Sequence, residues 1–209
     1  MTTFSILGAG SMASSIATVA LKGGATVQVL ARDPQNSAAA VAALGSGATS
    51  ARFGDALTGD VVVLALPYGA VADVVGQYAT QLDGKVVVDI TNPLDFTTFD
   101  DLSVASGTSA AQQIAALVPG ARVLKAFNMN FAATLATGKV GGATTTVLVA
   151  GDDVDAKATL IGVVEAAGLG AVDAGSLKRA QQLEALGFLQ LTLAVGEKIA
   201  WTGGFSLAR

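Results

Sequence analysis

The stretch SILGAGSMASSIA, residues 5–17, constrains the fold of this chain more than any other. It begins as a short apolar strand, passes through Gly8 and Gly10, and continues as a helix of small residues. The spacing matches G-x-G-x-x-G/A, with Ala13 in the third position. In such a turn Gly8 permits the sharp bend, Gly10 lets a pyrophosphate approach the backbone, and Ala13 lets the helix pack closely on the strand. We interpret it as a dinucleotide-binding turn; the alternative is a strand–helix turn without a ligand.

Strand and helix patterns alternate along the rest of the chain. Strands are expected at 4–7 and 26–30 and in DVVVLALP, KVVVDITNP, ARVLKAFN, TTTVLVAG and LGAVDAG; helices are expected at 11–22, 36–44, 70–82, 110–118, 154–167 and 177–200. A Gly-rich loop near 45–57 has room for one short strand. The alternation predicts an α/β fold of the Rossmann type, a doubly wound, mainly parallel sheet. The 209 residues suit one domain, 1–209, in which 175–209 form a C-terminal helix and tail.

Composition excludes several classes of function. The net charge is −4 and no basic run occurs, so we expect no nucleic-acid partner. The chain has no cysteine and no histidine, which removes disulfides, thiolate metal sites and the commonest general acid–base group. No apolar run reaches membrane-spanning length and no basic leader precedes the first strand, so a cytoplasmic protein without a membrane partner is expected. Asp152 and Asp153 lack a third ligand nearby, and we expect a helix cap there and no metal.

The end of the second strand should select the nucleotide. It reads VLARDP, with Ala31 where NAD-binding units usually carry an acid and Arg32 directly after it. An arginine fork suits a ribose 2′-phosphate, which an acid would repel. This favours NADP(H) as the cofactor. Asp33 could instead turn toward the ribose, which leaves use of NAD open, and a solvated Arg–Asp turn before Pro34 is the alternative without a ligand.

An ordered set of motifs carries a resemblance over almost the whole chain. The motifs are ILGAGSMA, LALPY, VVVDITNPL, VLKAFN, VLVAGDD and VDAGSLKRAQQLEALG. With them the chain resembles the NADP oxidoreductases dependent on coenzyme F420, a deazaflavin, and the cytosolic domains of membrane metalloreductases are similar too. The resemblance implies one Rossmann-like domain, often paired as a homodimer. The apolar surface of the C-terminal helix fits burial in such a dimer.

The resemblance also implies the cofactor contacts. The phosphate turn would use Gly8, Ala9, Gly10, Ser11 and Met12; Ala31, Arg32 and Asn36 would hold the 2′-phosphate; Leu66, Pro67 and Ala126 would lie near the ribose and nicotinamide. The GGFSL segment near the C-terminus would help to form the substrate wall. Thr91 and Asn92, just past a strand end, could hydrogen-bond the carboxamide or the substrate, or only shape the turn before Pro93.

The chemistry is expected to proceed without histidine. Hydride transfer between NADP(H) and a flavin-like or deazaflavin acceptor such as coenzyme F420 needs mainly alignment of two carbon atoms. The first alternative is an NADPH-dependent reductase of a small carbonyl or imine, with Tyr68, Lys125 or Asp89 as proton donor. Tyr68 could instead cap the pocket, and Lys125 could be a paired lysine inside a strand. The second alternative is a non-catalytic NADP-binding redox sensor. The basic residues that could meet the acidic tail of F420 are Lys125, Lys139, Lys178 and Arg179.

Overall fold

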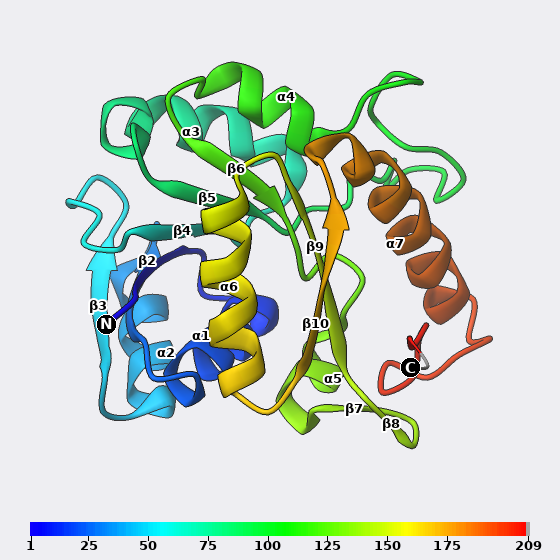
Figure 1. The fold of residues 1–209 in the computed structure, drawn as a ribbon, viewed down its shortest axis with the longest axis horizontal. Helices are drawn as coiled ribbons and strands as arrows, with labels where there is room; N and C mark the ends of the chain where they lie inside the picture. The colour runs from blue at the N-terminus through cyan, green and yellow to red at the C-terminus, as the bar shows by residue number, and fades with distance from the viewer. Residues whose placement is uncertain (208–209) are drawn as a thin grey trace.

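One mostly parallel sheet forms the centre of the protein, whose computed structural model describes residues 1–207 (Figure 1). The eight strands of this sheet follow the order β10-β9-β6-β5-β4-β1-β2-β3. Their bounds are β1 (Thr3–Leu7), β2 (Thr26–Ala31), β3 (Ala48–Arg52), β4 (Val61–Leu64), β5 (Val86–Asp89), β6 (Arg122–Lys125), β9 (Thr146–Gly151) and β10 (Gly170–Gly175). The six neighbouring strands β6, β5, β4, β1, β2 and β3 are all parallel to one another. Strand β9 pairs antiparallel with β6 and parallel with β10.

Helices cover both faces of this sheet. Figure 1 shows α3 (Tyr68–Leu82) and α4 (Ala110–Leu117) on one side and α1 (Ser11–Lys22), α2 (Pro34–Leu44) and α6 (Val154–Ala166) on the other. The pleat of β4 divides the core between them. Val61 and Val63 are buried with side chains of α1 and α6, while Val62 and Leu64 are buried with side chains of α3 and α4. Both faces are covered, which explains why β4 is apolar at every position.

The C-terminal half adds elements outside the two helical layers. The short helix α5 (Ala132–Thr137) and the hairpin of β7 (Lys139–Val140) and β8 (Ala143–Thr144) connect β6 to β9. A 3₁₀ turn at Leu177–Arg179 precedes α7 (Ala180–Val195), which lies at the right in Figure 1. No helix among residues 1–207 is long and apolar enough to cross a membrane.

The expected fold class is confirmed, with differences at element ends. Helix α1 has the expected bounds, but α2 begins at Pro34 because the Asp33 carboxylate accepts a hydrogen bond from the Gln35 backbone N–H and caps the helix. Helix α3 begins two residues earlier than expected, at Tyr68, and the last helix spans 180–195 instead of 177–200. The direction of β9 and β10 follows from the α5–hairpin connection, which the alternation of strands and helices does not reveal.

Candidate functional site

A cleft lies at the edge of the sheet where the chain changes direction. Strand β1 has β2 on one side and β4 on the other, so the helices that follow β1 and β4 leave the sheet in opposite directions. Dinucleotides bind at such a switch point, beyond the carboxyl ends of the strands. The cleft has a volume of about 300 Å³. Its walls are formed by Gly10, Ser11, Met12, Ala13, Ala65, Leu66, Pro67, Tyr68, Ile90, Thr91, Asn92, Phe96 and Leu191.

The two glycines of the opening turn have different roles. Gly8 has a φ of +128°, and a Cβ on it would lie 2.2 Å from the Ala65 carbonyl oxygen, so the fold requires glycine there. A Cβ on Gly10 would meet no protein atom within 4 Å. The space beside Gly10 is therefore open on the cleft side, as an approaching pyrophosphate needs.

The first turn of α1 keeps its backbone donors available. Asp33, Ser109 and Asp153 cap α2, α4 and α6 with side-chain hydrogen bonds, so the expected capping role is confirmed for Asp153. The Asp152 carboxylate instead accepts a hydrogen bond from the Leu177 backbone N–H. At α1 the N-cap is Gly10, which provides no side-chain cap. An uncapped helix start at the mouth of an open glycine turn fits a dinucleotide phosphate, because its N–H groups and the helix dipole attract an anion.

Two arginines lie at the ends of neighbouring strands, beyond this turn. Arg32 directly follows β2 and is exposed, and Arg52 ends β3 opposite Ala31, which is buried. Neither guanidinium forms an ion pair with a carboxylate in the described residues. The Asp33 carboxylate is used in its helix cap, and Asn36 is exposed in the first turn of α2. Sequence reasoning missed Arg52, although its position at the end of a short strand in the Gly-rich segment was the available signal.

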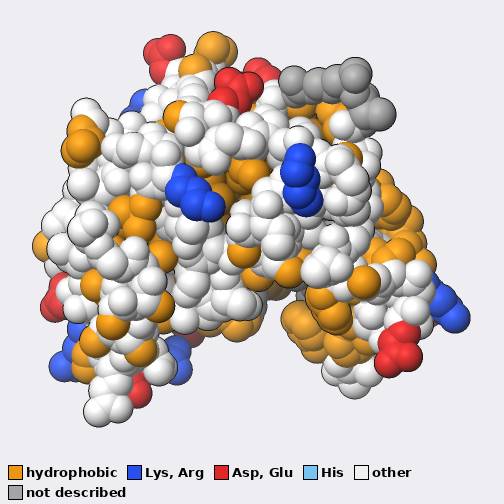
Figure 2. Space-filling view, turned by 90° about the horizontal axis from the view of Figure 1, so that it is seen from below, with side chains coloured by type: hydrophobic (Ala, Val, Ile, Leu, Met, Phe, Trp, Pro, Cys, Tyr) orange, Lys and Arg blue, Asp and Glu red, His pale blue; other side chains and the backbone are white. Residues whose placement is uncertain are grey.

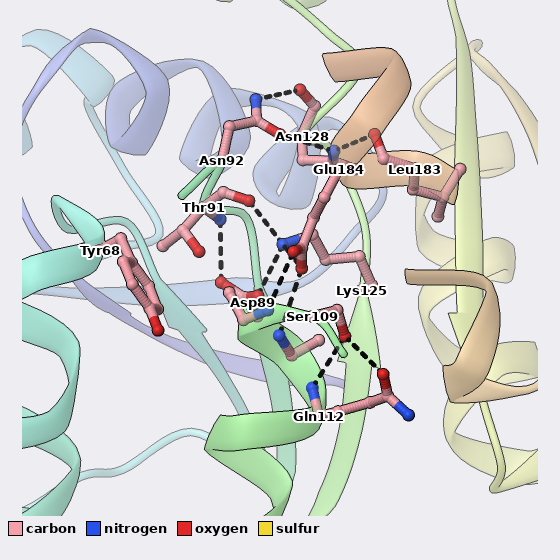
Figure 3. Close-up of polar contacts among 12 residues, drawn as sticks. Tyr68, Asp89, Thr91, Asn92, Ser109, Gln112, Lys125, Asn128, Leu183 and Glu184 are labelled. Carbon is pink, nitrogen blue, oxygen red and sulfur yellow. Dashed lines mark hydrogen bonds and ion pairs between the residues drawn. The ribbon is translucent and has the colours of Figure 1, made fainter. Parts of the chain in front are cut away.

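A buried ionic cluster supports the other side of the cleft (Figure 3). The Lys125 ammonium lies 2.7 Å from Asp89 Oδ2 and 2.8 Å from Glu184 Oε1, and the three side chains are at most 1% exposed. Lys125 also donates to the Thr91 carbonyl oxygen, and the Thr91 N–H donates to Asp89 Oδ1. The cluster therefore fixes the backbone of a residue in the cleft wall. It also places the Lys125 ammonium away from solvent, so Lys125 cannot meet the acidic tail of a bound molecule.

Glu184 joins this cluster to two helices. It comes from α7 and accepts hydrogen bonds from the backbone N–H groups of Ala110 and Ala111, at the start of α4. Burial raises the pKa of Glu184, and this effect outweighs the nearby Lys125 ammonium, which lowers the pKa. Sequence reasoning missed Glu184, because a single acid in a helical pattern ordinarily reads as a solvated residue.

Tyr68 stands beside the cleft with its hydroxyl already engaged. It is the first residue of α3, and its hydroxyl donates to Gln113 Oε1 of α4 over 2.5 Å. Burial, followed by the charges of Glu184 and Asp89, raises the pKa of Tyr68. The phenol therefore stays protonated at neutral pH. Its hydrogen bond to Gln113 fits the role of a pocket cap.

The structure brings together only part of the expected site. Of the expected cofactor residues, the cleft wall contains Gly10, Ser11, Met12, Leu66, Pro67 and Asn92. Ala126 is fully buried and does not line the cleft, because its N–H extends the strand ladder by donating to the Asp89 carbonyl oxygen. The GGFSL segment, residues 203–207, is also absent from this wall. Phe96 and Leu191 also line the cleft, but no sequence motif indicated that they belong to this site.

The first prediction tests the turn. Replacing Gly10 by Val should reduce binding of both NADPH and NADH below detection, because the added side chain fills the approach to the pyrophosphate. The thermal unfolding temperature should change little, since no protein atom lies within 4 Å of the new Cβ. Gly8→Val is the contrasting variant and should disrupt the fold itself. Calorimetry that finds undiminished NADPH binding by Gly10→Val would remove this turn from the site.

The second prediction tests the buried cluster. Lys125→Met should lower the free energy of unfolding by about 3–5 kcal/mol at neutral pH, because it leaves buried carboxylates without a cation. Burial already raises the Glu184 pKa, and loss of the ammonium would raise it further. The folded variant then binds a proton more tightly than the unfolded chain, so its stability should rise as the pH falls.

Urea unfolding of this variant at pH 5.5 and pH 8 measures both effects. Lys157→Met is the matched control, because the partner of Lys157, Asp173, is 50% exposed. That control should cost about 1 kcal/mol or less. An equal loss of unfolding free energy in the two variants would show that the buried cluster at Lys125 stabilises the fold no more than the partly exposed Lys157–Asp173 ion pair does.

Comparison with known proteins identifies the family. Residues 3–93 match the family model described as NADP oxidoreductase, coenzyme F420-dependent. The chain is 31% identical over 181 residues to metalloreductase STEAP3 of Rattus norvegicus and 30% identical over 149 residues to the F420-dependent NADP reductase of Methanocaldococcus jannaschii. These matches cover 87% and 69% of this chain, but the chain spans only 35% and 66% of the two relatives.

Solved structures agree with this result. A protein from Arthrobacter sp. FB24, which carries a provisional assignment as an F420-dependent NADP reductase, has a TM-score of 0.87 at 26% identity, covering 100% of both chains. The hypothetical protein SMa0349 from Sinorhizobium meliloti has a TM-score of 0.75 at 32% identity, covering 85% of this chain and 86% of its own. An imine reductase from Myxococcus stipitatus shares the fold alone, with a TM-score of 0.67 at 20% identity, covering 94% of this chain and 63% of its own. The chain belongs to the family of coenzyme F420-dependent NADP oxidoreductases.

Proposed function

We propose that this protein is an NADPH-dependent oxidoreductase that transfers hydride between NADP(H) and a flavin-like or deazaflavin acceptor, with coenzyme F420 as the first candidate. The observation that carries the proposal is that acid–base groups near the cleft are already engaged. Lys125 is held between Asp89 and Glu184, and the Tyr68 hydroxyl donates to Gln113. A site of this kind aligns two redox carriers and asks for little proton chemistry from side chains.

Different residues of the chain bind different parts of NADPH, whose nicotinamide ring supplies the hydride. The free N–H groups of α1 bind the pyrophosphate beside Gly10, and Arg32 and Arg52 bind the 2′-phosphate. Leu66 and Pro67 pack against the ribose and nicotinamide. The apolar wall formed with Phe96 leaves one side of the nicotinamide for the acceptor.

Two relatives support the choice of acceptor. The protein from Methanocaldococcus jannaschii is an F420-dependent NADP reductase, and the one from Arthrobacter carries the same assignment provisionally. The exposed basic residues Lys139, Lys178 and Arg179 remain the proposed partners of the acidic tail of F420. A reductase of small carbonyls or imines would need a free proton donor at the cleft, which the engaged Tyr68 and Lys125 do not offer.

A homodimer is part of the proposal. The outer face of α7 exposes Leu186, Leu189 and Val195, which are 41–48% exposed, and Trp201 in the tail is 51% exposed. Figure 2 shows hydrophobic side chains gathered on the side of the molecule where α7 lies in Figure 1. Pairing with a second copy would bury this surface.

NADPH oxidation against a panel of acceptors tests the function. The panel holds coenzyme F420, FMN, a quinone, a small aldehyde and a cyclic imine, each monitored by loss of NADPH absorbance. Turnover with F420 or FMN and none with the aldehyde or imine supports the proposal. Turnover with the imine alone supports the reductase alternative. Tight NADPH binding with no turnover of any acceptor supports the redox sensor.

The third prediction concerns the choice of nucleotide. Arg32→Ala should weaken NADPH binding roughly 10- to 150-fold, which corresponds to about 1.5–3 kcal/mol for a charge-assisted phosphate contact. NADH binding should change little, and Arg52→Ala should show the same selectivity. Arg122→Ala is the control. Arg122 begins β6, so it lies at the amino ends of the parallel strands, away from the cleft, and it donates to the Gly84 carbonyl oxygen. Calorimetric losses that are equal for NADPH and NADH would contradict the role in binding 2′-phosphate.

The fourth prediction concerns the chemical step. Tyr68→Phe keeps the ring and removes the hydroxyl that bonds Gln113. Hydride transfer measured in single turnover should slow less than about tenfold, whereas loss of a general acid would slow it about 10²–10⁴-fold. Gln113→Leu is the companion variant, since it removes the same hydrogen bond and leaves the hydroxyl. A large loss for Tyr68→Phe that Gln113→Leu does not share would establish Tyr68 as a proton donor.

A further inference from the structure

Two asparagine amides lie side by side between the cleft and α7. Asn92 follows β5 and lines the cleft, and its Nδ2 donates to the Asn128 carbonyl oxygen over 2.8 Å. Asn128 Nδ2 donates in return to Asn92 Oδ1 and to the Leu183 carbonyl oxygen of α7, each over 2.8 Å. Figure 3 shows the two side chains facing each other beside α7.

This exchange fixes the orientation of the Asn92 amide. A flipped amide would place its NH₂ group against the NH₂ group of Asn128, which is held in turn by the Leu183 carbonyl oxygen. An amide nitrogen carries two hydrogens, and only one of those on Asn92 Nδ2 is used, toward the Asn128 carbonyl oxygen. In a planar amide the other hydrogen points away from Asn128. Asn92 therefore offers a ligand in the cleft an unused N–H, whereas its Oδ1 already accepts a hydrogen bond from Asn128 Nδ2.

Helix α7 supports this orientation through a residue without a side chain. A Cβ on Gly187 would lie 2.4 Å from Asn92 Oδ1 and 2.9 Å from Asn128 Nδ2. Glycine inside a helix costs about 1 kcal/mol relative to alanine, so its presence here needs a reason. The reason is the close approach of α7 to the amide pair, one turn after Glu184 binds the Lys125 ammonium.

The position of Asn92 identifies the ligand atom. In the proposed binding mode, the pyrophosphate lies at the Gly10 turn after β1, and the 2′-phosphate lies at Arg32 and Arg52, at the ends of the neighbouring strands β2 and β3. The other half of the dinucleotide then crosses the switch point toward β4 and β5, where Asn92 lies in the same cleft as Gly10. The strongest acceptor at that end is the carbonyl oxygen of the nicotinamide carboxamide, because the ribose hydroxyls are weaker acceptors.

We infer that Asn92 donates its free N–H to the carbonyl oxygen of the nicotinamide carboxamide, and that Asn128 and Gly187 are positioning residues that fix this donor. The inference rests on the NADP binding proposed above and adds the polarity of the contact. It also gives α7 a role in orienting the nicotinamide. Asn128 and Gly187 act through Asn92 and need not touch the cofactor themselves.

Binding of two ligands by three variants tests the inference. The ligands are NADP⁺ and its 3-acetylpyridine analogue, which keeps the carbonyl oxygen and replaces the NH₂ group by methyl. Asn92→Ala should weaken binding of both ligands by the same factor, about five- to tenfold, as loss of one hydrogen bond implies. Gly187→Ala should produce the same loss for both. The double variant should lose no more than Asn92→Ala alone, because the shortened side chain vacates the space that the new Cβ needs.

The matched control is Gly162→Ala in α6, an exposed helical glycine with no atom within 4 Å of its Cβ position, which should bind both ligands as the unaltered protein does. A loss confined to NADP⁺ in Asn92→Ala would show that Asn92 accepts from the NH₂ group, which overturns the inferred polarity. Unchanged binding by Gly187→Ala overturns the role of α7. If Gly187→Ala does not fold, Asn128→Ala replaces it with the same expected loss for both ligands. An unaltered protein that binds neither ligand overturns the proposed function itself, and the inference with it.

Discussion

The Lys125 ammonium, enclosed by two carboxylates, is the contact on which the cleft depends. It joins the ends of β5 and β6 to α7 through Asp89 and Glu184, and Glu184 in turn binds the first N–H groups of α4. Charges so deeply buried are stable only while each has its partner. Four elements that are distant in the sequence therefore meet at one point, and the Thr91 backbone in the cleft wall is held there too.

Helix α7 consequently docks in an unusual manner. An ordinary surface helix buries an apolar stripe and exposes its polar face. Here the buried face includes Glu184, Gly187 and Gln190, while Leu186 and Leu189 are exposed. Gln190 donates to the Met129 carbonyl oxygen and accepts from the Phe205 N–H, so the tail is attached through the same polar face. These polar contacts fix the position of α7 against the rest of the domain. The apolar side of α7 stays exposed, where a second protein surface can pack against it.

The two halves of the site differ in how far the sequence predicts them. The strand, turn and helix at residues 3–22 follow from local rules, because the glycine spacing, small residues and helical pattern lie within one continuous segment. Lys125 and Glu184 are 59 positions apart, and neither the strand pattern nor the helix pattern signals their pairing. The direction of β9 was also hidden, since it depends on the short α5 and hairpin connection. Ala126 is buried outside the cleft wall because the strand ladder continues through it, and its motif does not reveal this continuation.

This difference bears on what the family resemblance can determine. The matched residues 3–93 contain the glycine turn, Arg32 and the ends of β4 and β5, which are the parts that we propose hold the nucleotide. Helix α7 and the segment with Phe96, which close the other side of the cleft, lie outside the match. Nucleotide recognition depends on backbone N–H groups and exposed charges of short segments, so relatives can retain it while their acceptors differ. Under the proposed function, the acceptor would instead meet a wall whose position depends on the buried ionic cluster and the amide pair. On this proposal, acceptor choice is a property of tertiary contacts around α7, and it is there that differences between relatives should be sought.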